Sequence, residues 1–166
     1  VFVFNLDGSV SYLNPAFETV FGWTLKELAG KRIPFVPESH KAQTREGVAR
    51  LFRENTLHNF ETKRLTKDGR LLDIVIDGAM FYDEDDQPAG QVVTLRDITR
   101  AKRTARINRT LFRITKAIPH YRGVDDLLAF ITREIQDLME IESASVILLD
   151  EDRQEFYFSA VHHDDT

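Results

Sequence analysis

Residues 92–118 read VVTLRDITRAKRTARINRTLFRITKAI, and this stretch joins a predicted strand directly to a predicted helix. Val92 to Leu95 indicate the strand, because these residue types favour β-structure. From Thr99 to Ile118 the chain contains no Pro or Gly that would interrupt a helix. Four apolar residues recur there at spacings of four, three and four, typical of a coiled-coil seam or a core-facing helix: Ile107, Leu111, Ile114 and Ile118. A change in the sheet before Asp97 would therefore act mechanically on the helix.

The composition sets limits on the class of protein. The 166 residues suffice for one domain, or for one domain and part of another, and a hydrophobic content of 42% supports a real core. We expect a soluble, cytoplasmic protein without membrane contact, since no apolar run is long enough to span a bilayer and the N-terminus lacks an export pattern. The absence of cysteine excludes disulfides, thiolate metal ligands and cysteine nucleophiles. A net charge of −5 argues against nucleic-acid binding.

Strand and helix signals alternate through the first half of the chain. Before Val92, strands are predicted at Val1–Asn5, Val10–Leu13, Leu57–Leu65 and Arg70–Phe81. Short helices are expected to begin at Asn14-Pro15, an N-cap followed by proline, and at the capping box Thr24–Glu27. A third helix is predicted over Ser39–Glu54. Its inward-facing residues are expected to be Val48, Leu51 and Phe52.

The predicted strand Arg70–Phe81 has one apolar and one polar face. The apolar face carries Leu72, Ile74, Ile76, Gly78 and Met80. Asp73 and Asp77 share the other face, so one side of the sheet should be packed and the other wet or against a polar partner. Gly78 would leave room on the packed side, and Asp83–Gly90 should form a solvated acidic loop.

The order of these elements, together with five short motifs, resembles a PAS domain with its C-terminal PAC segment. The motifs are Tyr12-Leu13-Asn14-Pro15-Ala16-Phe17, Gly22-Trp23-Thr24, Glu27-Leu28-Ala29-Gly30-Lys31, Lys67-Asp68-Gly69 and Arg96-Asp97-Ile98-Thr99. The resemblance implies an α+β sensor domain over residues 1–98, in which a five-stranded antiparallel sheet with helices on one face encloses a small cavity. In PAS relatives the Asp-Ile-Thr triad ties the last strand to the output helix, which would assign signal relay to Asp97, Ile98 and Thr99.

The remainder of the chain resembles a signalling linker followed by the beginning of a GAF domain. The linker helix is predicted over residues 99–120 and the incomplete GAF-like domain over residues 121–166. Asp125 is expected to cap an amphipathic helix that ends at Met139. A hairpin follows, with predicted strands Ser145–Leu149 and Glu155–Val161 and a turn at Asp150–Gln154. The family's further strands do not follow in this sequence, so no complete GAF pocket is expected.

Cofactor and catalytic motifs are sparse. The five histidines, His40, His58, His120, His162 and His163, lack the spacing of a zinc site, so no metal is predicted. Haem-binding PAS relatives take their iron ligand from the connecting helix, but the matching position falls near Thr44 and not on His40. Flavin-binding relatives need a cysteine for their photoadduct. We therefore expect neither haem nor covalent flavin, while an unidentified small molecule stays open. No nucleophile elbow, phosphate-binding glycine loop or kinase motif indicates an enzyme.

Two interpretations fit the large apolar residues of the PAS-like part. They either fill a dry core, which we favour because a domain of this size needs them for stability, or form the walls of a ligand cavity. The ligand-binding candidates are Phe17, Phe21, Trp23, Leu28, Phe35, Leu51, Ile74, Ile76, Gly78, Met80 and Leu95. Ile33, Phe60 and Val93 share their character.

The sequence thus predicts a non-catalytic sensory and relay segment of a multidomain signalling protein, such as a sensor histidine kinase, acting on an effector domain of the same chain. The alternative is a purely structural dimerisation module without a ligand. In either case we expect a homodimer, with helices 99–118 paired in parallel along the seam of Ile107, Leu111, Ile114 and Ile118. The GAF-like helix and hairpin would pack against the partner chain.

Overall fold

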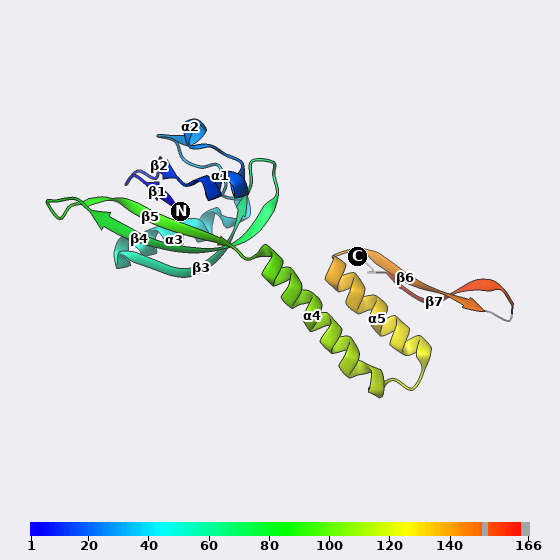
Figure 1. Cartoon of the computed structure of the whole chain (residues 1–166). Coiled ribbons are helices and arrows are strands. Elements are labelled where there is room, and N and C mark those ends of the chain that lie inside the picture. Colours follow the sequence, from blue (N-terminus) through cyan, green and yellow to red (C-terminus); the bar gives the residue numbers. More distant parts are fainter. Residues whose placement is uncertain (151–152, 164–166) are drawn as a thin grey trace. The chain divides into compact units, whose positions relative to one another are not determined.

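The computed structural model of the chain describes residues 1–150 and 153–163, the last six of them without side chains. The chain divides into two compact units, Val1–Arg100 and Ala101–Thr166 (Figure 1). Parts of two predicted segments, the turn Asp150–Gln154 and the end of the GAF-like domain 121–166, lie outside the described residues.

The first unit is built on the five-stranded antiparallel sheet that the sequence predicted. Its strands are β1 (Phe2–Phe4), β2 (Val10–Leu13), β3 (Thr56–Leu65), β4 (Leu71–Tyr82) and β5 (Pro88–Asp97). They lie in the order β2-β1-β5-β4-β3, so that β5 is the central strand and pairs with β4 along nearly its whole length. The strand that leads into the long helix is therefore held on both sides by the sheet.

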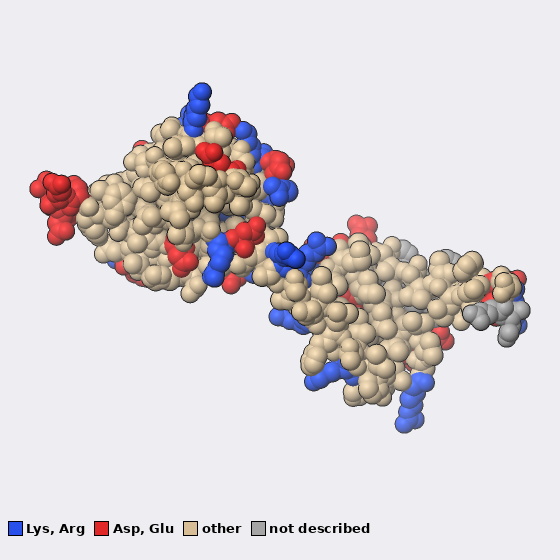
Figure 2. Space-filling model, in the orientation of Figure 1, with Lys and Arg blue, Asp and Glu red and all other residues tan. Residues whose placement is uncertain are grey.

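The acidic connection between β4 and β5 is shorter than predicted. β5 already begins at Pro88, so the turn covers residues 83–87 and not Asp83–Gly90. Asp83 Oδ1 accepts hydrogen bonds from the backbone N–H groups of Asp85 and Gln87, at 3.0 and 2.8 Å. Figure 2 shows the acidic side chains of this turn gathered at its tip.

Helices pack on the face of the sheet that carries Phe2, Ile74 and Val93. They are α1 (Pro15–Phe21), α2 (Leu25–Leu28), a short 3-10 helix η1 (Glu38–His40) and α3 (Lys41–Glu54). An aromatic cluster lies between the two layers, in which Phe17 stacks on Phe21 with ring centres 4.7 Å apart. Phe2 is 1% exposed and Ile74 is fully buried, so this face is a dry core for much of its area.

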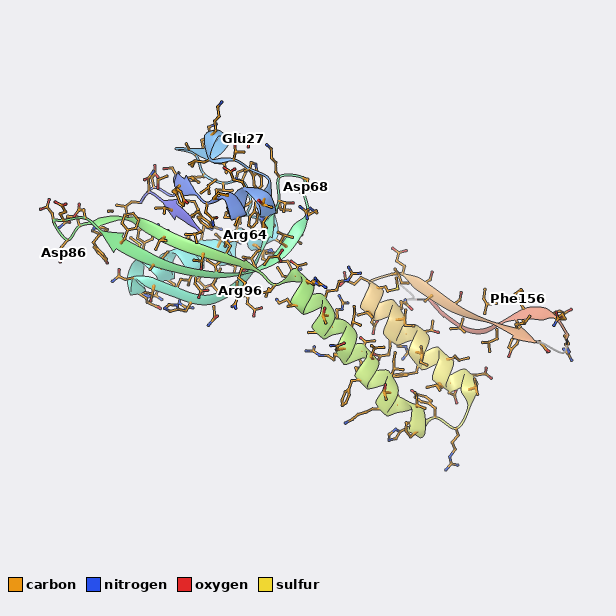
Figure 3. The ribbon with its side chains drawn as sticks, viewed as in Figure 1. Glu27, Arg64, Asp68, Asp86, Arg96 and Phe156 are labelled. Atoms are coloured by element: carbon orange, nitrogen blue, oxygen red, sulfur yellow. The ribbon has the colours of Figure 1, made fainter. Side chains whose placement is uncertain are left out.

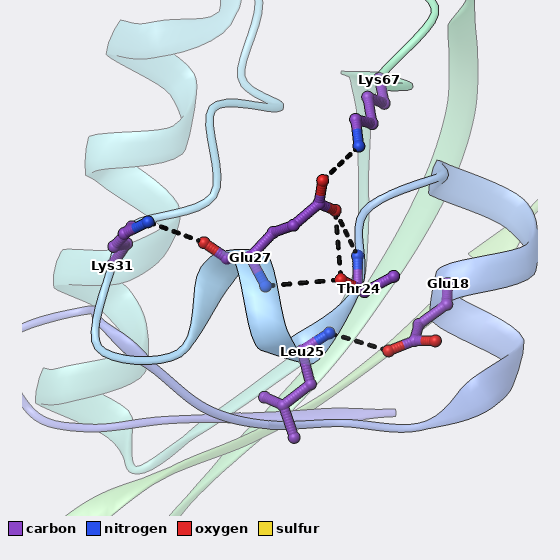
Figure 4. Close-up of polar contacts among 6 residues, drawn as sticks. All are labelled: Glu18, Thr24, Leu25, Glu27, Lys31 and Lys67. Carbon is purple, nitrogen blue, oxygen red and sulfur yellow. Dashed lines mark hydrogen bonds and ion pairs between the residues drawn. The ribbon is translucent and has the colours of Figure 1, made fainter.

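The first two helices begin at the predicted caps. Asn14 Oδ1 accepts a hydrogen bond from Phe17 N at 3.1 Å. Thr24 and Glu27 form a capping box: Glu27 N donates to Thr24 Oγ1 at 3.4 Å, and Thr24 N donates to Glu27 Oε2 at 3.0 Å (Figure 4). The other carboxylate oxygen of Glu27 pairs with Lys67 Nζ at 2.5 Å. This ion pair fastens α2 to the turn between β3 and β4.

A β-bulge decides which residues of β3 face the helices. The pairing of β3 with β4 shifts register between Leu57 and Phe60, where β3 accommodates one extra residue. Asn59 has a positive φ of 49° there, and its N–H donates to Asp77 Oδ1 at 3.0 Å. After the bulge, the residues on the inward face are Phe60, Thr62 and Arg64.

The inward face of α3 differs from the prediction. Gly47 and Leu51 are buried, whereas Val48 and Phe52 are 43% and 44% exposed. A methyl group at Gly47 would come within 2.8 Å of Phe60 Cζ, so the helix approaches the sheet most closely at this glycine. Of the three residues predicted to face inward, only Leu51 does so fully, because the close contact at Gly47 sets the rotation of the helix.

The second unit contains two helices and a hairpin. They are α4 (Thr99–Ala117, whose first two residues belong to the first unit), η2 (Ile118–His120), α5 (Val124–Met139), β6 (Ser143–Asp150) and β7 (Glu155–His163). The predicted long helix, second helix and hairpin are thus present. The predicted cap is wrong, because Gly123 is the N-cap of α5 and Asp125 lies in its first turn.

The hairpin has one covered and one open face. α5 packs against both strands, and Ala144, Val146 and Leu148 of β6 are half-buried. The opposite face carries exposed apolar side chains: Ile147, Leu149 and Phe156, the last of which is 76% exposed. This open face is unusual for a free-standing domain.

Polar contacts link α4 to α5. Arg106 Nη1 pairs with Glu140 Oε1 at 2.5 Å, and Arg113 Nη2 pairs with Glu134 Oε1 at 2.5 Å. Glu134 is 3% exposed, and its second oxygen, Oε2, has no partner among the described residues. Two ion pairs therefore contribute to the contact between these helices.

Candidate functional site

A cavity of about 520 Å³ lies in the first unit, between α3 and the sheet, and its size is typical of small-molecule sites. Its buried apolar wall includes Phe2, Ile33, Phe35, Leu51, Leu57, Ile76 and Val93. Exposed residues also line it, among them Arg32, Arg45, Val48 and Phe52. The cavity therefore reaches the surface beside α3, and the two apolar residues wrongly predicted to face the core lie at its edge.

The cavity takes in only part of the predicted ligand-binding set. Phe35, Leu51 and Ile76 line it, as do Ile33, Phe60 and Val93. The other members of the set lie in or against the surrounding core: Phe17, Phe21, Trp23, Leu28, Ile74, Gly78, Met80 and Leu95. The structure thus divides these residues between a cavity wall and a packed core.

Gly78 does not open the space that was expected beside it. A methyl group at Gly78 would lie 3.5 Å from Leu51 Cδ2 and 3.7 Å from Val93 Cγ2, which are ordinary contact distances. The side chains of Leu51 and Val93 occupy the room at this glycine, and these two residues line the cavity whereas Gly78 does not.

Arg64 contributes a buried cation to the cavity wall, and the sequence analysis missed it. It is 2% exposed and lies inside the first unit (Figure 3). Its Nη1 donates to Thr62 Oγ1 at 3.0 Å and to Lys63 O at 2.8 Å, while its guanidinium lies 5.1 Å from the centre of the Phe35 ring. Burial lowers the pKa of Arg64 to about 10, so the side chain remains charged at neutral pH.

Positive charge outweighs negative charge around the cavity. Among the described residues that line it, Arg32, Arg45 and Arg64 carry guanidinium groups, and Asp7 alone carries a carboxylate. Asp7 Oδ1 already accepts a hydrogen bond from Ser9 N at 2.8 Å. The pKa of Asp7 is lowered mainly by the hydrogen bond from the Ser9 side chain and next by the hydrogen bond from the Ser9 backbone. Ser9 therefore already provides hydrogen bonds to this carboxylate.

The joint between β5 and α4, residues 97–99, is held by hydrogen bonds. Asp97 Oδ1 accepts a hydrogen bond from Thr99 N at 2.9 Å, which satisfies one of the backbone N–H groups at the start of the helix. Thr99 Oγ1 accepts from Asp73 N, and Ile98 N donates to Asp73 O, both at 2.9 Å. One residue of β4 thus holds both Ile98 and Thr99 at the start of α4.

The predicted dimer seam lies on α4 and on the residue that follows it. Leu111 and Ile118 are 56% and 49% exposed, Ile107 is 36% exposed, and Ile114 is half-buried. Neighbouring Phe112 is 60% exposed. Several apolar side chains in the C-terminal half of this helix are therefore uncovered in the single chain.

The described residues show neither a membrane-spanning helix nor a metal-binding cluster. In the part of the chain that the structure describes, every helix falls short of the length and hydrophobicity that a membrane span requires. Within the same residues, no group of three or more His, Asp or Glu side chains is placed to hold a metal ion.

Comparison with known proteins gives one curated relative. The chain is 30% identical over 104 residues to sporulation kinase C of Bacillus subtilis (strain 168), an alignment that covers 61% of this chain and 24% of the kinase. The chain therefore spans about a quarter of the length of that relative.

Solved structures share the fold at lower identity. The PAS domain of a protein from Colwellia psychrerythraea gives a TM-score of 0.55 at 24% identity, over 60% of this chain and 85% of that one. A sensory box histidine kinase/response regulator from Burkholderia thailandensis E264 gives a TM-score of 0.51 at 23% identity, over 68% of this chain and 88% of that one. At these identities the likeness shows the fold alone. Residues 1–98, more than half of the chain, match the family described as the PAS fold, and the chain therefore belongs to the PAS family.

Proposed function

We propose that the chain is a non-catalytic sensory and relay segment of a larger signalling protein of the sensor histidine kinase class. Its PAS unit resembles part of a sporulation kinase, and the solved structures of similar fold include a histidine kinase/response regulator. The occupancy of the cavity is sensed, and the signal passes through α4 to an effector domain of the same protein.

One observation carries this proposal: the two strands that wall the cavity also form the joint. Ile76 and Val93 line the cavity on β4 and β5. Asp73 lies on the same strand as Ile76 and forms hydrogen bonds with Ile98 and Thr99, which follow β5 directly. A ligand that shifts β5 against β4 would thus change the contacts that orient α4, biasing two arrangements of the helix.

The second unit serves, in this proposal, as a linker helix followed by the first elements of a GAF-like domain. The order of a long helix, a second helix and a β-hairpin supports this assignment. The open apolar face of Ile147, Leu149 and Phe156 also supports it, because further strands or a partner chain would cover that face.

Thr99→Val in the full-length signalling protein tests the relay. The substitution removes the acceptor for Asp73 N with little change in shape, so output should lose its dependence on the state of the PAS unit. Thr104→Val is the matched control, since Thr104 is exposed on the same helix and should leave output unchanged. Wild-type output from the Thr99 variant would contradict the relay.

A structural dimerisation module without a ligand is the second candidate function. The exposed apolar residues of α4, Leu111 and Phe112 above all, favour it because they suit a helix that pairs with a second copy. A small molecule retained by the purified protein, seen by native mass spectrometry, would favour sensing. A dimer with an empty cavity and unaltered output on cavity substitution would favour the structural module.

A further inference from the structure

Arg64 is a buried cation whose hydrogen-bonding capacity is only partly used. A guanidinium carries five N–H donors, and both hydrogen bonds that Arg64 donates come from Nη1. Its Nε is buried and has no partner among the described residues. Within the same residues, Arg64 forms no ion pair with a carboxylate, and burial is the one cause that perturbs its pKa. A charge buried in this way is costly unless a counter-ion meets it.

The stacking of Arg64 on Phe35 compensates for only part of that cost. The contact at 5.1 Å is a cation–π interaction with the face of the guanidinium, so it does not use the N–H groups on its edge, of which those of Nη1 already donate to Thr62 and Lys63. Phe35 itself lines the cavity, so the ring holds the planar cation at the cavity wall. This is the arrangement of a preorganised anion-binding group and not of a satisfied structural arginine.

A second unpartnered polar atom lines the same cavity. Thr44 Oγ1, on α3, is buried and without a partner in the described part of the chain. A chain of hydrogen bonds leads from Arg64 to the residue before Thr44: Arg64 Nη1 donates to Thr62 Oγ1, and Thr62 Oγ1 donates to Gln43 Oε1. Two orphaned groups at one cavity wall indicate a polar partner that the protein itself does not supply.

We propose that the cavity binds a small monocarboxylate with an apolar body, whose carboxylate pairs with Arg64. The carboxylate matches the fork of the guanidinium, and Thr44 Oγ1 offers a further hydrogen bond. The body of the ligand lies against Leu51, Phe60, Ile76 and Val93. One buried guanidinium balances one negative charge, so a phosphate dianion would leave charge uncompensated among apolar side chains. The inference rests on the proposed sensory function and names the class of its ligand.

Isothermal titration calorimetry on the purified chain tests the proposal. The probes are octanoate and 3-phenylpropionate, each compared with the amide of the same shape, which lacks the charge. At least one acid should bind saturably, and its amide should bind at least about tenfold more weakly. In Arg64→Met, acid affinity should fall by at least about tenfold and the preference for acid over amide should vanish. Arg96→Met is the matched control, since Arg96 is exposed on β5 (Figure 3) and should not affect binding.

Folding of the variant is checked separately by thermal unfolding. Arg64→Met removes an unpaired buried charge, so the variant should unfold at a temperature no lower than the wild type. If Arg64→Met does not fold, Arg64→Lys replaces it, because lysine keeps the charge but lacks the planar fork of the guanidinium. The comparison of acid with amide on the wild-type protein needs no variant.

Three results would overturn the inference: no saturable binding of either acid up to about 1 mM, equal affinity for acid and amide, or acid binding unchanged in Arg64→Met. These results leave the relay untouched, because the Thr99→Val experiment reads output and not binding. Conversely, acid binding together with unaltered output from Thr99→Val would refute the relay, while the proposal that the cavity binds a monocarboxylate would stand.

Discussion

Glu27 joins the capping box of α2 to Lys67, and its charge should be visible in the pH dependence of stability. The hydrogen bond from Lys67, followed by that from Thr24 N, lowers the pKa of Glu27 from 4.5 to about 2. A carboxylate with a lowered pKa stabilises the fold above its unfolded pKa, and this contribution is lost as the pH falls through the folded pKa. We expect Glu27→Gln to lower the Tm at pH 7. The difference from wild type should shrink between pH 4.5 and about 2.

Thermal unfolding followed by circular dichroism across this pH range makes the measurement. Glu84→Gln is the matched control, because Glu84 lies exposed in the β4–β5 turn and the same loss of charge should leave the Tm nearly unchanged. A Tm for Glu27→Gln equal to that of wild type at pH 7 would show that the Lys67 ion pair contributes nothing.

Substitution by alanine should change the stability of the fold differently at two buried glycines. Gly47→Ala would place a methyl group 2.8 Å from Phe60 Cζ and force that ring toward the cavity, so we expect a net loss of about 1 kcal/mol despite the better helix propensity of alanine. Gly78→Ala meets only ordinary contacts, at 3.5 Å or more, and should be neutral or slightly stabilising. Urea denaturation of both variants provides the comparison. Equal stability changes would mean that α3 does not rest on Phe60 as described.

Arg64 shows where prediction from sequence stops at the level of single residues. Alternation along β3 would place every second residue inward, but the bulge before Phe60 resets the count, and no local pattern in the sequence announces it. An arginine in a strand is also expected to face solvent. The usable signal was Phe60 itself: if this ring faces the core, Thr62 and Arg64 must share its face.

At the scale of elements, Asp97 should stabilise the start of α4. Asp97→Ala removes the acceptor for Thr99 N and should cost about 1 kcal/mol in the free energy of unfolding. Asp97→Asn keeps an acceptor oxygen and should lose clearly less, which separates the hydrogen bond from the charge. Urea denaturation measures both. Equal losses in the two variants would mean that charge alone matters, and no loss in either would remove Asp97 from the joint.

The contact of α4 with α5 depends on a buried carboxylate and should show non-additive energetics. Arg113→Met leaves Glu134, which is 3% exposed, without its partner, so protection of α5 amides from hydrogen exchange should fall. Arg113→Met combined with Glu134→Leu removes both charges and should restore most of that protection. If the double variant is as weakened as the single one, the ion pair does not organise this helix contact.

Most elements were predictable, because their signals are local. The capping groups at Asn14 and Thr24, the strand that feeds α4, and the unbroken helix after Thr99 all follow from the chemistry of adjacent residues. The facing of α3 was not predictable, since it depends on how closely Gly47 can approach Phe60, a contact between distant segments. The prediction of the N-cap of α5 was wrong for a different reason. Asp125 is a good capping residue, but the helix begins two residues earlier, with Gly123 at the N-cap position.

At the scale of the whole molecule, we expect a homodimer. The seam exposes Ile107, Leu111 and Ile118, and the hairpin exposes a second apolar face, so one chain leaves two surfaces that a partner could cover. The seam alone is about two heptads long, which is too short to hold a dimer by itself. We expect the seam and the hairpin face to hold the dimer together. Light scattering over a dilution series should then show a dimer that dissociates only at low concentration.

Substitution of the seam distinguishes this dimer from nonspecific association. Leu111→Asp together with Ile114→Asp should give a monomer with the PAS unit still folded. Leu71→Asp, at an apolar residue of the first unit that is 47% exposed and lies outside the seam, α5 and the hairpin, should leave the dimer intact. A monomer at every wild-type concentration would be incompatible with pairing along α4.

The bulge in β3 makes this strand tolerant of a change in its length, because inward-facing residues stand on both sides of it. One extra residue beside Asn59 determines that Phe60, Thr62 and Arg64 are displayed to the interior while Glu61 and Lys63 are displayed outside. Loss of a single codon at this point would remove the bulge and leave both sets in place, because Leu57 and Phe60 would then stand two positions apart and still face inward. Relatives that lack one residue between Leu57 and Phe60 should thus keep the same cavity wall, and a gap in their alignment at this point would mark a regular strand in place of the bulge.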